Sequence, residues 1–265
     1  VKEQGIGDEI LFSSMYPDLL KKFPDCIIET EKRLLSLFKS SFGKEKNFVE
    51  YRSISDHSKK LNSFDYTIYA GSLGKLFRNS IDDFPRKAFL KDSNKINLKT
   101  KNLFDKNRDK IKIGISWTSK AAVGEEKSLS LELIKPILNL GNKYAFMNLQ
   151  YHNSSEEIQK FQNKNKSIII NQFLDIDMYN DFDSLASILK KLDLFVTVSN
   201  STAHLAASLG VETWIIKPKN HAVFHYWNQP NNSSPWYESV KLYNYKGDWS
   251  ITVQEIKEDL LIKFK

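Results

Sequence analysis

The sequence predicts an α/β fold, in which strands and helices alternate in Rossmann-like layers. Three observations support this prediction. Residues 193–216 contain two short apolar runs separated by a helical stretch, the pattern of a βαβ unit. Another apolar run starts at 111–117, directly after a Lys- and Asn-rich segment (91–110) that is typical of a surface helix or linker. Strand and helix patterns also alternate over the rest of the chain, without a short repeat.

The unit at 193–216 holds the first candidate binding site. Its first strand, 193–199, is apolar and β-branched, and it is followed by three residues that cap helices well: Asn200, Ser201 and Thr202. Ligands of open α/β sheets bind at the carboxyl ends of strands, and a helix N-terminus there favours phosphate. We expect these residues to bind phosphate, together with His204 about one turn into the helix. The alternative is a packing unit with a well-capped helix.

The segment E-Q-G-I-G-D at residues 3–8 precedes a helix that we expect to run to about Lys22. Gly5 and Gly7 permit a tight turn and a close approach of the backbone to a ligand. Asp8 lies near the start of the helix, where the helix dipole stabilises a carboxylate. Two roles stay open for Asp8, a helix cap or a general base at the mouth of a cleft.

The rest of the N-terminal half is expected to hold one helix at 33–42 and three strands, at 26–29, 48–51 and 64–70. The third strand runs into the loop G-S-L-G-K-L-F-R at 71–78. Ser72 and Lys75 of this loop either contact an acceptor or belong to a plain turn.

A polar loop after the strand 111–117 is the second candidate site. It brings hydroxyl and ammonium groups to the carboxyl end of a strand, namely Ser116, Thr118, Lys120 and Lys127. Such groups suit a diphosphate, and the alternative is a solvated loop in a Lys-rich chain. Gln150, at the end of the expected strand 144–150, is grouped with this donor-binding set. The other expected elements are helices at 131–140, 156–162, 183–192 and 251–264, and strands at 167–171, 212–216 and 240–243.

The segment 219–237 is dense in aromatic, proline and turn residues. Trp227 and Trp236 are expected either to wall a sugar or base site or to cover the edge of the sheet. His221 and His225 lack the spacing of a metal site, so no metal is expected.

Composition and charge exclude several classes of function. The chain has 265 residues, 41% hydrophobic and 27% charged, as in a soluble globular protein. Its net charge of +7 comes from lysines spread along the chain, so nucleic-acid binding is not expected. No apolar run approaches the roughly 18 residues of a membrane span. The single cysteine, Cys26, permits no internal disulfide and fits a reducing cytoplasm.

Six stretches, in order, resemble glycosyltransferase family 9, the lipopolysaccharide heptosyltransferase group. They are E-Q-G-I-G-D-E-I-L-F-S-S at 3–14, G-S-L-G-K-L-F-R at 71–78, K-I-G-I-S-W-T-S at 112–119, K-S-L-S-L-E at 127–132, the run from D-F-D-S-L-A to H-L-A-A-S-L-G at 181–210, and S-P-W-Y-E-S-V-K-L-Y with G-D-W at 234–249. The sequence is most similar to the glycosyltransferase-like domain at the C-terminus of many bacterial tetratricopeptide-repeat proteins. Each motif is weak alone, but the ordered set spans nearly the whole chain.

The resemblance implies a GT-B architecture, two Rossmann-like domains that face each other across a cleft. We expect an acceptor domain over 1–105, a donor domain over 106–250, and a last helix in 251–265 that crosses back to the first domain. The resemblance implies transfer of a sugar from a nucleotide-diphosphate donor to a glycan, lipid or protein hydroxyl. Transfer would invert the anomeric carbon, without a metal or other cofactor. A cytoplasmic protein, at most peripheral to the inner membrane, is implied.

By matching position, the resemblance makes Asp8 the base that deprotonates the acceptor hydroxyl. It places further residues at the donor phosphates and glycosyl oxygens: Thr118, Lys127, Ser201, Thr202 and His204. The chain departs from the family in two ways, because Ser199 stands where members usually carry Asp, and the first strand is largely absent before Glu3. The alternative function is therefore a non-catalytic GT-B scaffold or sugar-nucleotide-binding module of a larger tetratricopeptide-repeat protein.

Overall fold

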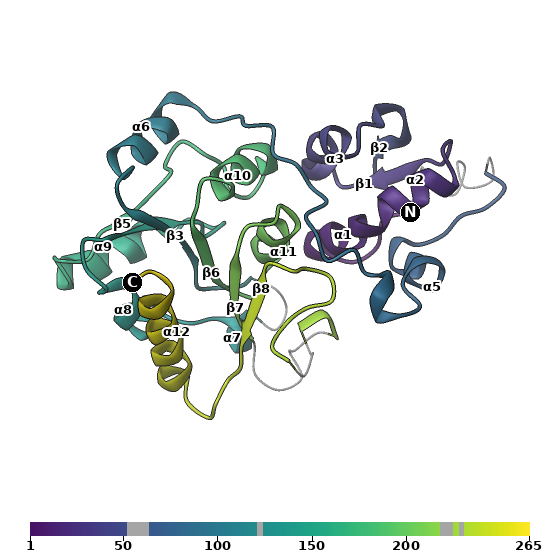
Figure 1. Cartoon of the computed structure of the whole chain (residues 1–265). Coiled ribbons are helices and arrows are strands. Elements are labelled where there is room, and N and C mark those ends of the chain that lie inside the picture. Colours follow the sequence, from purple (N-terminus) through teal and green to yellow (C-terminus); the bar gives the residue numbers. More distant parts are fainter. Residues whose placement is uncertain (52–63, 121–123, 218–224, 228–230) are drawn as a thin grey trace.

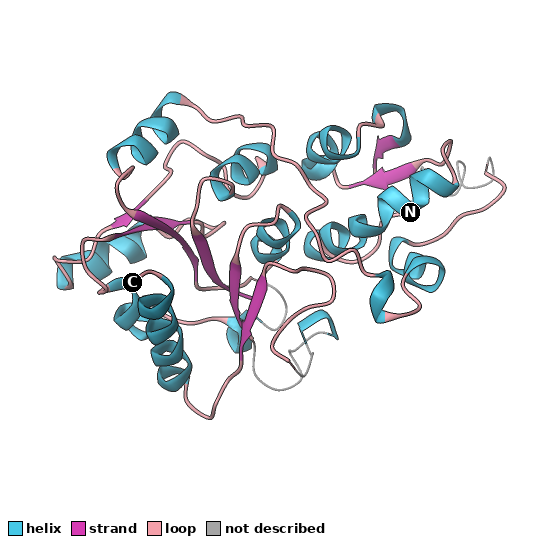
Figure 2. Cartoon of the chain, viewed as in Figure 1, coloured by secondary structure: helices cyan, strands magenta, loops and turns pink. Residues whose placement is uncertain are grey.

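The computed structural model describes residues 1–51, 64–120, 124–217, 225–227 and 231–265 (Figure 1). His221 lies outside these residues, as does the side chain of His225. The chain forms a larger C-terminal half built on a parallel sheet and a smaller N-terminal half that packs beside it (Figures 1 and 2).

The C-terminal half contains a six-stranded sheet in which every neighbouring pair is parallel. The strand order is β5-β4-β3-β6-β7-β8, with bounds Ile170–Asn171, Tyr144–Asn148, Ile111–Ser116, Leu194–Val198, Thr213–Ile216 and Val240–Tyr243. The order reverses between β3 and β6, because β4 and β5 lie on one side of β3 while β6 to β8 follow on the other. This is the strand order of a Rossmann sheet, and the reversal marks where such sheets bind ligands. The predicted α/β fold is confirmed.

Helices cover both faces of this sheet. One apolar cluster joins the sheet to α8 (Leu131–Leu138), α9 (Ser155–Lys164) and α12 (Trp249–Lys263). The opposite face carries α10 (Phe182–Leu189) and α11 (Ser201–Ser208). We expected the last helix to cross back to the N-terminal half, but Val253, Ile256 and Leu260 of α12 are buried in the cluster of the C-terminal half, where α12 packs on α8. The short helices α6 (Leu98–Lys106) and α7 (Gly124–Lys127) flank β3 in the chain.

The N-terminal half contains two described strands, β1 (Ile28–Thr30) and β2 (Phe48–Glu50), which pair in parallel. Its helices are α1 (Ile6–Phe12), α2 (Tyr16–Lys22), α3 (Leu35–Phe42) and α5 (Gly74–Phe77), with short 3-10 turns at Ser13–Met15, Lys32–Leu34, Glu45–Asn47, Ala70–Leu73 and Ile81–Asp83. The strand predicted at 64–70 does not form. The physical reason is that a strand needs a ladder, and among the described residues the backbone of this segment bonds only to Val1 and, within a local turn, to Ser72.

The two halves share one apolar cluster. Its members run from Ile10 and Leu11 of α1 to Leu205 of α11 and Leu242 of β8. Helix α1 packs directly on α11 (Figure 1). The beginning of α1 is therefore held against the helix that starts at the end of β6.

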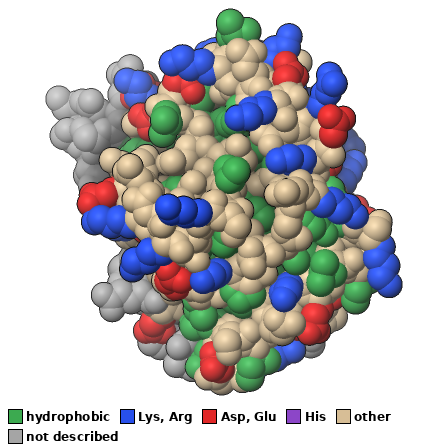
Figure 3. All heavy atoms as spheres, turned by 90° about the vertical axis from the view of Figure 1, so that its left-hand side faces the viewer, with side chains coloured by type: hydrophobic (Ala, Val, Ile, Leu, Met, Phe, Trp, Pro, Cys, Tyr) green, Lys and Arg blue, Asp and Glu red, His purple; other side chains and the backbone are tan. Residues whose placement is uncertain are grey.

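Charged side chains are mixed on the face shown in Figure 3, which is the left-hand side of Figure 1. Lys and Arg side chains there are interspersed with Asp and Glu and do not form a continuous basic patch. This distribution agrees with lysines that are spread along the sequence.

Candidate active site

The turn between β6 and α11 lies at the point where the strand order reverses. The Asn200 side chain accepts a hydrogen bond from Ala203 N (3.0 Å), which caps α11. Its Nδ2 donates to Ser116 Oγ at the end of β3 (2.9 Å), so the ends of β3 and β6 are tied together. The first N–H groups of a helix have no partner within the helix, and those of Ser201 and Thr202 begin α11 beside this tie. The turn has the local geometry of an anion site.

Gln150 connects the loop after β3 to the end of β4. Its Oε1 accepts hydrogen bonds from Ser116 Oγ (3.1 Å), Trp117 N (3.0 Å) and Thr118 N (3.0 Å). Its Nε2 donates to Thr118 O (3.1 Å). The Gln150 side chain is buried, so these bonds are shielded from water. Gln150 therefore fixes the loop that we predicted to bind a donor.

Two side chains of this loop are suited to bind an anion. The Thr118 Oγ1 atom is buried and has no hydrogen-bond partner among the described residues. The Lys127 side chain is only 6% exposed, and burial lowers its pKa, while the negative charge of Asp8 acts in the opposite direction. Asp8 belongs to α1 and Lys127 to α7, so these two charges come from the two halves of the chain.

The buried Lys127 predicts a specific dependence of stability on pH. Its folded pKa is below the unfolded value of 10.5, so the unfolded chain binds more protons as pH approaches 10.5 from below. The free energy of unfolding of the wild type should therefore rise relative to that of Lys127→Met as pH increases in this range. Urea unfolding at several pH values measures the difference. The exposed Lys101→Met is the control, and an equal trend in both variants would contradict the prediction.

Asp8 caps α1 and also lies near the candidate anion site. Its Oδ2 accepts a hydrogen bond from Gly5 N (3.2 Å), as the cap interpretation requires. Its charge also acts on buried tyrosines, because the pKa values of Tyr226 and Tyr237 are raised, first by burial and in part by Asp8. The cap does not exclude catalysis, since one carboxylate oxygen suffices for that bond. The role of Asp8 as a base stays a prediction.

An aromatic cluster surrounds His204. The imidazole is buried, stacks on Trp227 with ring centroids 4.8 Å apart, and shares a hydrogen bond between Nδ1 and the Tyr237 hydroxyl (2.9 Å). These contacts give His204 a packing role beneath α1. Its use as a phosphate contact stays a prediction.

Trp227 and Trp236, which we expected either to wall a sugar or base site or to cover the edge of the sheet, are core residues. Trp227 is fully buried and donates from Nε1 to Ser199 Oγ (3.0 Å), while Trp236 is buried against Phe84 in an edge-on contact. These contacts give both tryptophans a packing role, and a ligand contact by either of them stays a prediction. Ser199, which stands where the family that the sequence resembles usually carries Asp, accepts the hydrogen bond from Trp227 Nε1.

The close packing of α1 on α11 depends on Gly7. A Cβ atom at Gly7 would lie 3.1 Å from His204 Cδ2 and 3.5 Å from Ser201 Cα. The glycine pair was predicted to permit a close approach of the backbone to a ligand. Gly7 permits a close approach to α11, and Gly5 is exposed at the start of α1, so a ligand contact at this turn stays a prediction.

We expect Gly7→Leu to destabilise the protein by about 1–3 kcal/mol, as is typical of overpacking. The added side chain would push α1 away from His204 and Ser201. Gly74→Leu is the matched control, because a Cβ at Gly74 meets no atom within 4 Å and the residue has helical dihedral angles. Urea unfolding compares the two variants. Equal stability losses would show that the contact between α1 and α11 tolerates a side chain.

The loop at 71–75 lies beside the segment that leads into α1. Gly71 N donates to Glu3 Oε2 (3.1 Å), and a Cβ at Gly71 would crowd both Glu3 and Phe12. Ser72 follows directly and is partly exposed, whereas Lys75 is exposed on α5. The structure thus brings the Ser72 loop to the 3–8 segment, while contacts of Ser72 and Lys75 with an acceptor stay predictions.

A pocket of about 380 Å³ opens at the carboxyl ends of β4 and β5, next to Gln150. Its lining is mostly polar and includes Asn148, His152 and Asp177. The His152 pKa is lowered, first by burial and then by the positive charge of Lys120. Lys120 itself is exposed, and its backbone N–H donates to the Tyr151 hydroxyl. The predicted donor-binding residues Lys120 and Gln150 therefore flank a cavity that can admit part of a ligand.

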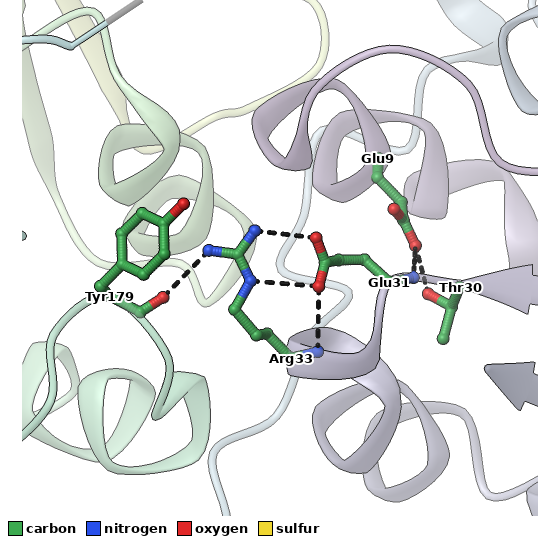
Figure 4. A network of polar contacts seen from close by, with 5 residues as sticks. All are labelled: Glu9, Thr30, Glu31, Arg33 and Tyr179. Atoms are coloured by element: carbon green, nitrogen blue, oxygen red, sulfur yellow. Dashed lines mark hydrogen bonds and ion pairs between the residues drawn. The ribbon is translucent and has the colours of Figure 1, made fainter. Parts of the chain in front are cut away.

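Arg33, which was not among the predicted site residues, links the two halves near this pocket (Figure 4). Its guanidinium pairs with Glu31 through two bonds (3.1 and 2.8 Å) and donates to Tyr179 O (3.1 Å). It also lies over the Tyr179 ring, 4.6 Å from the centroid. Hydrogen bonds from Arg33 are the main reason that the Glu31 pKa is lowered. No local motif signals this contact.

Among the described residues, no group of three His, Cys, Asp or Glu side chains is arranged as a metal site. In the same part of the chain, every helix is too short or too polar to span a bilayer.

This chain is similar in sequence to one known protein and in structure to several. No family model matches the sequence. The chain is 28% identical over 272 residues to Protein FlbA of Caulobacter vibrioides, an alignment that covers 96% of this chain and 44% of FlbA. The chain therefore spans less than half the length of this curated relative.

Three solved structures are similar over nearly the whole chain. The glycosyl transferase family 9 structure from Veillonella parvula gives a TM-score of 0.65 at 14% identity, covering 99% of this chain and 96% of that one. ADP-heptose lps heptosyltransferase II of E. coli gives 0.62 at 13% identity, covering 98% and 96%. E. coli heptosyltransferase WaaC, solved with ADP-2-deoxy-2-fluoro heptose, gives 0.55 at 10% identity, covering 98% and 100%. At these identities the likeness establishes the fold, and this chain has the GT-B fold of the family 9 glycosyltransferases.

Proposed function

We propose that this protein is a glycosyltransferase that moves a sugar from a nucleotide-diphosphate donor to a hydroxyl acceptor. One observation carries the proposal: the start of α1, which carries Asp8, packs against the N-terminus of α11 at the reversal of the strand order, and a Cβ at Gly7 would lie 3.5 Å from Ser201 Cα. A carboxylate of one half that lies beside a candidate anion site of the other half is the arrangement that sugar transfer from a diphosphate donor requires. The three similar solved structures are glycosyltransferases, which supports this class of reaction.

In the proposed mechanism, the donor diphosphate lies on the N–H groups of Ser201 and Thr202. Lys127 and the Thr118 hydroxyl offset the negative charge that develops on the leaving nucleotide diphosphate. Asp8 accepts the proton of the acceptor hydroxyl, whose oxygen attacks the anomeric carbon from the side opposite the leaving group. This displacement inverts the anomeric carbon and needs no metal. The pocket beside Gln150 accommodates the nucleoside.

A specific observation favours a second candidate, a non-catalytic sugar-nucleotide-binding module. Ser199 Oγ accepts a hydrogen bond from Trp227 Nε1, at a position where the family that the sequence resembles usually has a carboxylate. Such a module would keep the anion site without sugar transfer. The 44% coverage of FlbA is consistent with a part of a larger protein, and both the acceptor and the tetratricopeptide-repeat context remain part of the proposal.

Calorimetric titration with nucleoside diphosphates and their sugar conjugates tests the donor site. We expect one base to bind selectively, and Thr118→Val to weaken that binding by about tenfold or more, as for loss of a hydrogen bond to a charged group. Thr252→Val makes the same change at a buried threonine of α12 and should leave the affinity unchanged. Absence of binding across the panel would contradict the donor site. Selective binding without sugar transfer to any hydroxyl acceptor would favour the second candidate.

A further inference from the structure

One wall of the pocket beside Gln150 is an irregular segment, residues 174–180, which we call the wall segment. It lies between β5 and α10 and consists of turns and bends. The residues of this segment that line the pocket are Leu174, Ile176, Asp177 and Met178. A segment without regular structure depends on individual contacts to keep one conformation.

Distant parts of the chain hold the wall segment at few points. Many of its hydrogen bonds are local, such as the one that Asp177 Oδ1 accepts from Tyr179 N (3.0 Å). Among the described residues, two hydrogen bonds reach it from distant parts of the chain. The first joins two exposed side chains, Asn97 Nδ2 and Asp175 Oδ2 (2.6 Å). The second is donated by Arg33 Nη1 to the backbone oxygen of Tyr179 (3.1 Å), and it comes from the other half of the molecule.

Arg33 holds the end of the wall segment that apolar packing leaves exposed. Ile176 and Met178 pack against the apolar cluster shared by the two halves, whereas Tyr179 is 53% exposed. The Arg33 guanidinium covers the Tyr179 ring, 4.6 Å from its centroid, while it also binds the carbonyl oxygen of that residue. A planar guanidinium suits this double contact, because it can stack on a ring while its N–H groups donate in the guanidinium plane.

Arg33 is itself held from the N-terminal half (Figure 4). The Glu31 carboxylate accepts hydrogen bonds from Arg33 Nε (3.1 Å) and Nη2 (2.8 Å). Glu31 N donates to Glu9 Oε1 (2.8 Å), and Glu9 is a fully buried residue of α1 that directly follows Asp8. The guanidinium is therefore tied, through Glu31, to the helix that carries the candidate base.

We infer that Arg33 is a positioning residue for the donor, which holds the wall segment from the opposite half in the conformation that binds the nucleoside. This inference rests on the proposed function, which assigns the pocket to the nucleoside. Arg33 lies outside the lining of the pocket, so it acts through the wall segment. A wall that is already ordered removes part of the ordering cost of binding, and the ligand that contacts it binds more tightly.

The coupling acts in both directions. If the bond from Arg33 favours nucleoside binding, a bound nucleoside must favour that bond by the same factor. A donor in the pocket would thereby strengthen a contact between the halves, and with it the hold on the helix that carries Asp8. One polar network then positions the donor and the base together, although they lie on different halves.

Three substitutions separate the parts of this contact. Arg33→Met removes the charge and every donor but keeps an unbranched apolar side chain. Arg33→Lys keeps the positive charge, but its single ammonium group lacks the planar fork that contacts Glu31 and Tyr179 together. Arg108→Met is the matched control, because the Arg108 side chain is 81% exposed and its ion pair is with the neighbouring Asp109.

Amide hydrogen exchange of the ligand-free protein measures the wall segment directly. We expect the amides of residues 177–181 to exchange at least about tenfold faster in Arg33→Met than in the wild type, as for loss of a hydrogen bond to a charged group. Arg33→Lys should give an intermediate rate, and Arg108→Met should match the wild type. Unchanged exchange in Arg33→Met would overturn the inference.

Calorimetry with two probes tests the effect on binding. One is the nucleoside diphosphate that the wild type selects, and the other is inorganic pyrophosphate, which has a diphosphate but no nucleoside. Arg33→Met should weaken binding of the nucleoside diphosphate by about tenfold and leave that of pyrophosphate unchanged. A general structural role, or a long-range effect of charge, would weaken both probes. Equal weakening of both, or wild-type affinity in Arg33→Lys, would therefore overturn the inference.

Failure of the inference and failure of the proposed function give different results. If the wild type binds no nucleoside diphosphate, the proposed donor site is contradicted, and with it any role of Arg33 in donor binding. If the wild type binds one selectively but Arg33→Met binds it equally well, the donor site stands and the role of Arg33 alone is contradicted.

Discussion

Asp8→Asn is expected to lower the rate of sugar transfer by at least about 100-fold while leaving the affinity for the donor nucleotide unchanged. The reason is that general base catalysis contributes about 10²- to 10⁴-fold, and an amide cannot accept the acceptor proton. Asn retains an oxygen that can accept the hydrogen bond from Gly5 N, so the start of α1 should stay intact. Steady-state transfer assays, with calorimetry for the donor nucleotide, measure the two quantities.

Asp8→Ala separates the base from the cap. It removes the Gly5 N bond as well as the base, and loss of a helix cap costs about 1 kcal/mol. Both variants should therefore lose transfer, but only Asp8→Ala should lose stability. If Asp8→Asn keeps full turnover per folded molecule, Asp8 is a cap alone and the base lies elsewhere.

The sequence could predict the C-terminal half because its signals are local. Central strands of a parallel sheet are buried on both faces, so β6 appears as the uninterrupted apolar run 194–198. The cap at Asn200 and the glycine at 210 delimit α11 within a few residues. Alternation of such elements is sufficient to predict a Rossmann sheet and its ligand-binding edge.

The parts that could not be predicted depend on contacts between distant segments. Residues 64–70 have a strand pattern, but a strand exists only where another strand pairs with it. The aromatic density near Trp227 predicts a packed surface without showing that the ring points into the core. Arg33 and Tyr179 are 146 positions apart, so only the fold brings them together. Gly7 has the sequence signature of ligand approach, and packing of α1 on α11 satisfies it equally well.

Gln150→Met is expected to cause the largest loss of stability among single substitutions at the site. Methionine fills a similar volume but cannot accept the hydrogen bonds from Ser116 Oγ, Trp117 N and Thr118 N. A buried donor left without an acceptor costs about 1–3 kcal/mol. Ser116 and Trp117 are buried, so a total loss of about 3 kcal/mol or more is expected, measured as the free energy of unfolding in urea.

Two comparisons make this expectation specific to the hydrogen bonds. Gln162→Met makes the same change on α9, where the side chain accepts one long bond from Ile170 N (3.4 Å), and should cost about 1 kcal/mol or less. Gln150→Glu restores the acceptor oxygen but loses the bond to Thr118 O, so its stability should fall between those of the wild type and Gln150→Met. If both Met variants lose equal stability, the loop is held by other contacts. If Gln150→Met alone is strongly destabilised, the loop that carries Thr118 depends on a residue from the neighbouring strand, because parallel strands place their carboxyl ends at one edge of the sheet.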